Sequence, residues 1–389
     1  MSAKDTSGKL IPLEALRGMA ALVVVVHHFV QCFLPGYDGT IMPYDADKAL
    51  LGTPLFAFIN GFGAVMLFFV LSGYVLSLKG FKPDAPRIIG EMALKRWLRL
   101  APPVTLSVLA VWVFFTLGWQ HYADAASFNH SDCLTFLMYS GMPQDARPGI
   151  TDALAQGLYR TFLFGDHSFN PSIWTMRIEF YGSFFVFAIA LTLRWPARRL
   201  LFIYLPLYAF LVWLNIFFLM LLPFLFGVIA AKATEKPRKL PAAPAFLLLA
   251  LGLYLCGYYV PIGWYGWLRA VHLSPPGYRM PILSLGGLML LIVFATENVI
   301  SKRFHGRLSR LLGQASFPLY LVHALLLTSP AAWAYAHFEG GAAGVTAALV
   351  TFIISALPAV WLLVLFESWW LGRLQSWRPF TRRGEKIYG

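Results

Sequence analysis

Residues 13–30 read LEALRGMAALVVVVHHFV, an apolar stretch with an arginine near its start and two adjacent histidines near its end. A helix needs roughly 20 apolar residues to cross a hydrocarbon core about 30 Å thick, and the apolar run extends far enough for a helix over about 13–34. Titratable side chains inside a membrane span are costly and usually face a cavity or another helix. The stretch therefore predicts both a membrane-spanning helix and a functional site on it.

The composition of the whole chain is that of a membrane protein. Of its 389 residues, 58% are hydrophobic, 16% are aromatic and only 13% are charged, whereas a soluble domain has about 25% charged residues. A soluble protein of this size could not bury so much apolar surface. High hydrophobicity and only three cysteines exclude a disordered chain and a disulfide scaffold. We predict an all-α, polytopic membrane protein.

Apolar runs of helical length recur along the chain and predict ten spans. A short N-terminal segment (1–12) precedes the transmembrane domain (13–372), and a basic tail (373–389) follows it. The longest polar segment between spans, about 120–172, is expected on the outer side, where such a loop is more often functional than idle. The predicted spans are about 13–34, 54–78, 98–119, 173–193, 200–214, 216–231, 243–260, 281–299, 313–336 and 343–370.

The positive charges fix the orientation of these spans. With the N-terminus in the cytoplasm, most of the 31 Lys and Arg residues fall in the inner segments and the tail, as the positive-inside rule requires. Both termini are therefore expected in the cytoplasm, and no cleavable signal is expected before the first span. The same distribution explains the net charge of +13 without a nucleic-acid partner.

The three cysteines, Cys32, Cys133 and Cys256, all fall in the outer half of this topology. A disulfide between two of them and three buried or unpaired thiols are both compatible with the sequence. Their spacing does not fit a zinc site, and we expect no bound metal.

One face of the first helix carries Arg17 and His28. Eleven residues at 100° each bring the helix back to within about 20°, so the two side chains share a face, roughly 16 Å apart along the axis. His27 lies about 80° from Arg17 and faces elsewhere. An imidazole in a partly hydrated cavity is suited to general-base catalysis. Alternatively, Arg17 anchors the helix at the membrane surface, and both histidines bond to neighbouring helices.

Three further groups place polar side chains beside an apolar channel. Glu179, roughly 9 Å inside the outer boundary, reaches a depth similar to that of His28 and could orient its imidazole, or it could be structural. Lys95, Arg96 and Arg99 could hold phosphates of a cytosolic ligand, or serve only as positive-inside anchors. Tyr320 and His323 lie near mid-membrane, where hydrogen bonding between helices is the alternative role.

Taken together, these residues resemble the acyltransferase-3 family of integral-membrane acyltransferases. The resemblance covers most of the chain and rests on five segments in the family's order. His27 beside His28, and Lys95 where arginine is common, depart from the pattern. The five segments are 13–28 with Arg17 and His28, Phe68–Tyr74, Lys95–Pro102, Ser172–Glu179 and Tyr320–His323.

The resemblance implies an enzyme that takes an acyl group, commonly acetyl, from cytosolic acyl-CoA. It passes the group across the membrane to a hydroxyl of an extracytoplasmic or lipid-linked carbohydrate. Acyl-CoA would be the donor substrate with no bound cofactor, and the protein would lie in the bilayer of a bacterial inner membrane. His28 and Glu179 would be catalytic, Arg17, Arg96 and Arg99 would bind acyl-CoA, and support would come from Ser72, Tyr74, Trp174, Tyr320 and His323.

Two other classes of function compete with this one. In a proton-coupled transporter or exporter, His28, Glu179 and His323 would form a proton relay, but we find no internal repeat of the kind common in such transporters. A non-catalytic membrane scaffold is the other alternative. Aromatic side chains of the outer loops, among them Trp264, Tyr265 and Trp267, could stack on sugar rings or belong to an interfacial aromatic belt.

Overall fold

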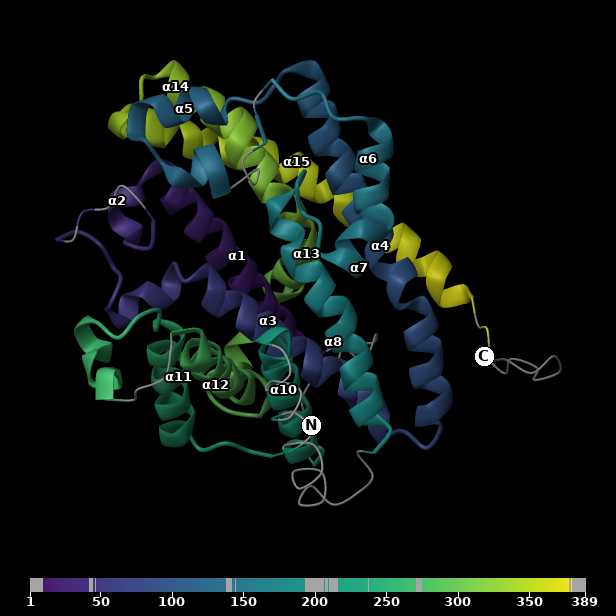
Figure 1. The fold of residues 1–389 in the computed structure, drawn as a ribbon. Coiled ribbons are helices and arrows are strands. Elements are labelled where there is room, and N and C mark those ends of the chain that lie inside the picture. Colours follow the sequence, from purple (N-terminus) through teal and green to yellow (C-terminus); the bar gives the residue numbers. More distant parts are fainter. Residues whose placement is uncertain are drawn as a thin grey trace.

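The computed structural model of the chain is an all-α assembly of long, closely packed helices (Figure 1). It describes residues 10–41, 45, 47–137, 142–143, 145–192, 206, 209, 216–236, 238–270, 275–377 and 379.

Six of the described helical segments are long and apolar enough to cross a membrane. They consist of α1 (Ile11–Phe33), α3 (Gly61–Ser77) with η2 (Leu78–Phe81), α4 (Ala85–Leu117), η5 (Pro171–Trp174) with α8 (Thr175–Ala190), α13 (Arg307–Leu326) with η9 (Leu327–Ala331) and α14 (Ala332–His337), and α15 (Gly341–Ser376). Three shorter apolar helices are α10 (Leu222–Ala233), α11 (Ala242–Cys256) and α12 (Pro275–Ala295).

Short helical segments connect these elements. Much of the predicted outer loop, about 120–172, is folded into such segments. The connecting elements are α2 (Pro35–Asp38), η1 (Pro54–Phe58), α5 (Tyr122–Asn129), η3 (Cys133–Leu137), α6 (Ile150–Ala155), η4 (Gln156–Arg160), α7 (Thr161–Phe164), η6 (Ile216–Leu221), η7 (Gly263–Ala270) and η8 (Ser301–Phe304).

The described helices overlap nine of the ten predicted spans, and six of the nine are long and apolar enough to cross a membrane, while the other three are shorter. Most ends differ by up to six residues, and two differ in a way that has a physical reason. The third predicted span began at 98, whereas α4 begins at Ala85, because its first turns are polar and carry no hydropathy signal. The second began at 54, but the separate turn η1 precedes α3 there, and the Asn60 side chain caps α3 by accepting a hydrogen bond from the Gly63 amide (3.0 Å). The fifth, 200–214, lies outside the described residues apart from Pro206 and Ala209.

The last long helix faces away from the rest of the protein. In α15 the most apolar window has a mean hydropathy of 2.5, yet only 11% of its residues are buried. Such a helix would expose a large apolar surface to water, which soluble monomers avoid. Lipid is the solvent that this surface fits.

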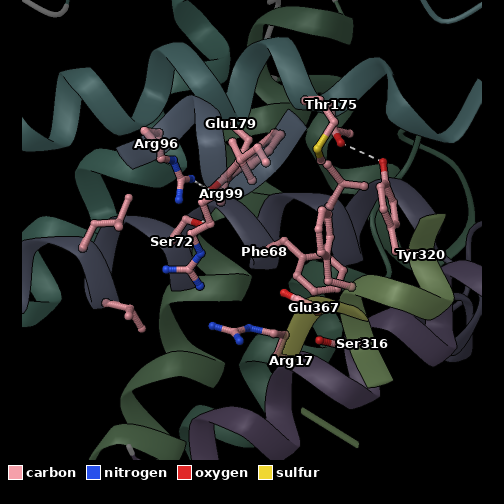
Figure 2. Close-up of a pocket in the computed structure, with 17 residues that line it drawn as sticks. Arg17, Phe68, Ser72, Arg96, Arg99, Thr175, Glu179, Ser316, Tyr320 and Glu367 are labelled. Carbon is pink, nitrogen blue, oxygen red and sulfur yellow. Dashed lines mark hydrogen bonds and ion pairs between the residues drawn. The ribbon is translucent and has the colours of Figure 1, made fainter. Parts of the chain in front are cut away.

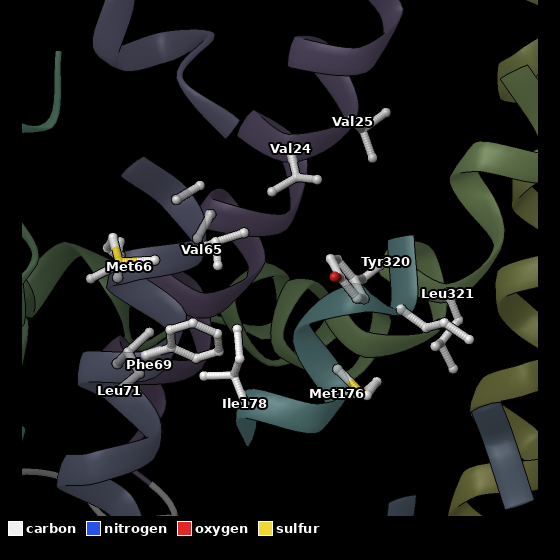
Figure 3. Packing of buried hydrophobic residues seen from close by; sticks show 14 of the residues in the cluster. Val24, Val25, Val65, Met66, Phe69, Leu71, Met176, Ile178, Tyr320 and Leu321 are labelled. Atoms are coloured by element: carbon white, nitrogen blue, oxygen red, sulfur yellow. The ribbon is translucent and has the colours of Figure 1, made fainter. Parts of the chain in front are cut away.

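The core lies where α1, α3, α8 and α13 meet. Buried side chains from all four helices fill it, including Val24, Met66, Ile178 and Leu321 (Figure 3). The pair α1 and α13 approaches closely at glycines: a Cβ on Gly18 would lie only 2.4 Å from the Cβ of Leu312. Small residues at such crossings let helix backbones pack tightly, and this crossing sets α1 against the helix that carries His323.

Two of the three buried cysteines face each other at the C-terminal end of α1. The sulfur atoms of Cys32 and Cys133 lie 2.7 Å apart, and all three cysteines are free thiols. We expect a mild oxidant such as diamide to join Cys32 to Cys133, because the two sulfurs already touch. Burial raises the pKa of the Cys133 thiol, so cross-linking should accelerate as the pH rises and the thiolate forms.

Mass spectrometry after alkylation in denaturant measures this cross-link directly. Cys256, which is also buried, is the internal control and should remain alkylated. Three alkylated thiols after oxidation at alkaline pH would contradict the prediction.

Candidate active site

A cavity of about 180 Å³ opens among α1, α3, α4, α8, α13 and α15. Figure 2 shows the charged ends of Arg17, Arg96 and Arg99 directed into it, with Ser72, Glu179 and Tyr320 around them. A second cavity of about 520 Å³ shares these three arginines and is also lined by Lys79 and Lys95. The two spaces adjoin, so they form one route that leads from a strongly basic opening into the helix bundle.

The three arginines at this junction are not equivalent. Arg17 pairs with Glu14 one turn earlier on α1 (Nη1–Oε2, 3.3 Å), whereas Arg99 lines both cavities and is exposed in the opening. Arg96 forms a buried ion pair with Glu179. Arg17 and Arg99 are therefore the cations best placed to meet a ligand's anionic groups.

The Arg96–Glu179 pair is largely shielded from water. The side chains are 7% and 13% exposed, and the Ser72 hydroxyl donates a second hydrogen bond to the same carboxylate (2.7 Å). The Nε of Arg96 is buried without a hydrogen-bond partner among the described residues. Charges buried to this degree need their partners, so the pair fixes α4 against α8 and α3 and forms one wall of the cavity.

These contacts correct one expectation about Glu179. Depth along the helices suggested that its carboxylate orients His28, but its hydrogen bonds and ion pair go to Arg96 and Ser72. The side chain that contacts His28 is His323, whose Nε2 lies 2.9 Å from His28 Nδ1. The two imidazole rings stack, with centroids 5.0 Å apart and planes 20° apart.

The hydrogen bonds around His323 assign the tautomers of this pair. His323 Nδ1 lies 2.8 Å from the carbonyl oxygen of Tyr320, and a carbonyl can only accept, so Nδ1 carries the proton. In neutral His323, Nε2 is then an acceptor and takes the Nδ1 proton of His28. The lone pair of His28 is therefore on Nε2, the position that a general base requires.

His27 has a different environment. Its Nδ1 lies 3.6 Å from the buried carboxylate of Asp38, and its ring packs against Gly61 at the start of α3. Its ring centroid is 5.1 Å from that of His28, with the planes tilted by 50°. The two adjacent histidines thus face different partners, and only His28 faces α13.

Residues on η5 and at its two ends join the arginine-lined cavity to the histidine pair. Thr175, the next residue in the chain, lines the cavity and contacts the Tyr320 hydroxyl (2.7 Å), while that hydroxyl donates to the carbonyl oxygen of Ser172. The Ser172 hydroxyl lies 3.4 Å from His323 Nε2. Asn170 caps η5 and donates to the Leu321 carbonyl (2.8 Å). The cavity thus ends at Thr175 and Tyr320, directly beside the histidines.

The predicted site residues divide into three groups. Arg17, Ser72, Arg96, Arg99, Glu179 and Tyr320 line the cavity, and His28 and His323 meet just beyond it. Tyr74 instead contacts Thr234 near the end of α10 (3.0 Å), and Trp174 stacks on Phe62. Sequence reasoning missed Asn170 and Glu367. The N-cap position of Asn170 before Pro171, and an acidic residue within the last span, were available signals for them.

Comparison with known proteins agrees with this geometry. A family model described as an acyltransferase domain (Acyl_transf_3) matches residues 11–366, which is most of the chain. The chain belongs to the acyltransferase 3 family. It is therefore an integral, multi-pass membrane acyltransferase that uses an acyl donor and an acceptor. The resemblance read from Arg17, His28 and the four later segments is confirmed.

One relative adds a narrower similarity. The curated O-acetyltransferase PaAT-1 of Phomopsis amygdali is 31% identical over 121 residues, which are 29% of this chain and 24% of that protein. The aligned part spans about a quarter of that relative. No solved structure matches the chain.

Proposed function

We propose that this acyltransferase 3 protein moves an acetyl group from cytosolic acetyl-CoA across the membrane to a hydroxyl of an extracytoplasmic or lipid-linked carbohydrate, in a bacterial inner membrane. The observation that carries the proposal is that a basic cavity ends beside the His28–His323 pair: Tyr320 lines the cavity, and its ring centroid is 5.8 Å from that of His323. Arginines meet the donor at one end, and an imidazole with a free Nε2 lone pair lies at the other.

The charges at the cavity opening complement those of the proposed donor. Acetyl-CoA carries phosphates on its nucleotide and a thioester at the end of a long, mostly neutral arm. Arg17 and Arg99 reach the cavity opening, where arginine is suited to bind phosphate through paired N–H groups. Arg17 and His28 lie about 16 Å apart along α1, a gap that an extended pantetheine arm can bridge.

His28 is the general base in the proposed reaction. Its Nε2 takes the proton of the acceptor hydroxyl while that oxygen attacks the thioester carbonyl, forming the new C–O bond. The C–S bond then breaks, and the proton passes from His28 to the departing CoA sulfur. His323 Nε2 holds the Nδ1 proton of His28 throughout, which keeps the ring oriented. Glu179 acts as a positioning residue through Arg96 and the cavity wall.

The oxyanion of this reaction needs a donor, and two tyrosine candidates are already engaged. The Tyr320 hydroxyl donates its proton to the Ser172 carbonyl, and the Tyr74 hydroxyl is hydrogen-bonded to that of Thr234, just after α10. The Ser172 hydroxyl lies 3.4 Å from His323 Nε2, so as an oxyanion donor it would turn its proton from that nitrogen to the thioester oxygen.

The function is tested with radiolabelled acetyl-CoA and membrane vesicles of both orientations. Inverted vesicles expose the cytosolic face, so label should pass into carbohydrate in their lumen, and sealed right-side-out vesicles should transfer none. Transfer from both sides equally would contradict transfer across the membrane. No transfer in inverted vesicles supplied with envelope glycans would contradict the donor or the acceptor class.

Arg99→Ala should weaken donor binding without disturbing the fold. Arg99 is exposed in the cavity opening and is not needed to neutralise Glu179, so its loss removes only a contact to the ligand. Charge-assisted hydrogen bonds contribute roughly 1.5–3 kcal/mol, which predicts a KM for acetyl-CoA about 10-fold to 100-fold higher at nearly unchanged kcat. Lys79→Ala, at the rim of the wider cavity, is the comparison variant and should have a smaller effect. An unchanged KM in Arg99→Ala would show that Arg99 does not bind the donor and serves only as a positive-inside anchor.

A further inference from the structure

Four flat side chains form a row that neither cavity includes. The ring of Trp174 stacks on that of Phe62, with centroids 6.4 Å apart and planes 4° apart. The guanidinium carbon of Arg279 lies 4.6 Å from the ring centroid of Phe62 and 4.6 Å from that of Tyr259. Each of the four side chains is partly exposed. In chain order the row joins the start of α3, the end of η5, the segment after α11 and the start of α12.

The row is held by a buried asparagine. The Asn60 side chain donates to the carbonyl oxygens of Cys256 (2.8 Å) and Tyr258 (3.1 Å) and accepts from the amide of Gly63 (3.0 Å). These three bonds tie the first turn of α3, which carries Phe62, to the segment that carries Tyr259. The separation between the two rings that hold Arg279 is thereby set by the backbone.

Arg279 has charge and hydrogen-bonding capacity that the described residues do not satisfy. Among the described residues it forms no ion pair, and its Nε is buried without a hydrogen-bond partner. Buried donors without partners are rare because each costs free energy. Cation–π contacts involve the faces of the guanidinium, whereas its N–H groups lie in its plane, and among the described residues no hydrogen bond from them is seen. An arginine restrained in this way is preorganised to bind a carboxylate or a phosphate through two hydrogen bonds.

The row begins beside the histidine pair. Trp174 ends η5, and Ser172 of the same short helix contacts His323. Gly61, next to Phe62, packs against His27. In the predicted orientation, α3, α8 and α12 start at the outer surface and α11 ends there. The row therefore lies on the outer side of the histidine pair, whereas the basic cavity opens toward the cytoplasm.

We propose that Trp174, Phe62, Arg279 and Tyr259 form the acceptor site, and that the acceptor carries a carboxylate or phosphate near the hydroxyl that is acylated. This inference rests on the proposed function. Arg279 binds the anionic group of the acceptor, and the outermost rings of the row provide flat apolar surfaces for a sugar ring. The acceptor is thus an acidic glycan or a phosphorylated sugar.

Binding measured without any acyl donor tests this site. The purified full-length protein in nanodiscs is titrated with tetragalacturonate, with glucose 1-phosphate, and with a neutral galactose tetramer. The wild type should bind one of the two anionic probes at least about 10-fold more tightly than the neutral one, as expected for charge-assisted hydrogen bonds. Tetragalacturonate binding indicates a carboxylate acceptor, and glucose 1-phosphate binding indicates a phosphate acceptor.

Two arginine variants distinguish a specific binding site from nonspecific electrostatic attraction of anions. Arg279→Gln should abolish the preference for the anionic probe. Arg269→Gln should retain it, because Arg269 is exposed and, among the described residues, donates to the Pro261 carbonyl alone (2.8 Å). Equal loss in both variants, retention in Arg279→Gln, or no anion preference in the wild type would each overturn the proposal. Because no acetyl-CoA is present, these results are independent of the vesicle assay, whose failure would instead count against the proposed function.

Discussion

Replacing His28 with alanine should lower acetyl transfer by at least about 100-fold, within the 10²–10⁴ range of general-base catalysis. The reason is specific to this nitrogen: His323 accepts the Nδ1 proton of His28 and leaves its Nε2 as the free lone pair at the end of the cavity. Initial rates at saturating acetyl-CoA measure the effect, and the KM for acetyl-CoA should change little because His28 lies away from the donor's phosphates.

The adjacent histidine provides the matched control for this prediction. His27→Gln changes a neighbouring imidazole that contacts Asp38 rather than His323, and it should keep most of the activity. Both variants should be compared at equal amounts of folded protein, judged by size-exclusion chromatography. Loss of activity in His27→Gln with activity retained in His28→Ala would reverse the assignment of the base.

The second large effect concerns the buried ion pair between α4 and α8. Arg96→Ala leaves the Glu179 carboxylate with only the Ser72 hydroxyl as its hydrogen-bond partner. Breaking a buried pair by removing one partner costs about 3–5 kcal/mol, whereas replacing both partners with apolar residues of similar volume is often neutral. We expect a clear fall in the thermal unfolding temperature for Arg96→Ala and for Glu179→Ala.

The double variant shows whether the pair is needed for folding or for function. Arg96→Met combined with Glu179→Leu should recover most of the unfolding temperature and should still lack activity, because the cavity wall has lost its polar groups. A double variant that is both stable and active would show that the pair is only structural. One that is as unstable as the single variants would show that neighbouring groups, such as Ser72, also depend on it.

Periodicity within one helix was enough to predict part of the site. Arg17 and His28 share a face of α1 because their spacing is close to a whole number of helical turns, and Arg17 lines the cavity that leads toward His28. The span positions were also predictable from hydropathy, but their ends were less so, above all where α4 extends into a polar stretch before residue 98. That extension depends on contacts with other elements, such as the hydrogen bond from Trp97 Nε1 to the Leu158 carbonyl (2.8 Å).

Partners from distant parts of the chain could not be predicted in this way. His28 and His323 are 295 positions apart in the sequence, and Arg96 and Glu179 are 83 apart. Their contacts depend on how the helices cross, including the close approach of α1 and α13 at Gly18. Depth in the membrane placed Glu179 at the level of His28, but helix depth carries no information about which face of α8 meets α1 or α4.

A single unbroken helix, α1 (Ile11–Phe33), carries both Arg17, proposed to bind the donor's phosphates, and His28, the proposed general base. The distance along α1 between Arg17 and His28 is therefore fixed, and movement of other helices relative to α1 does not change it. The acyl group must be brought that far by the donor's own flexible arm. In acetyl phosphate the anionic group is attached directly to the acyl carbon, so this short compound cannot contact Arg17 and His28 at the same time. It should therefore be a poor donor even at high concentration.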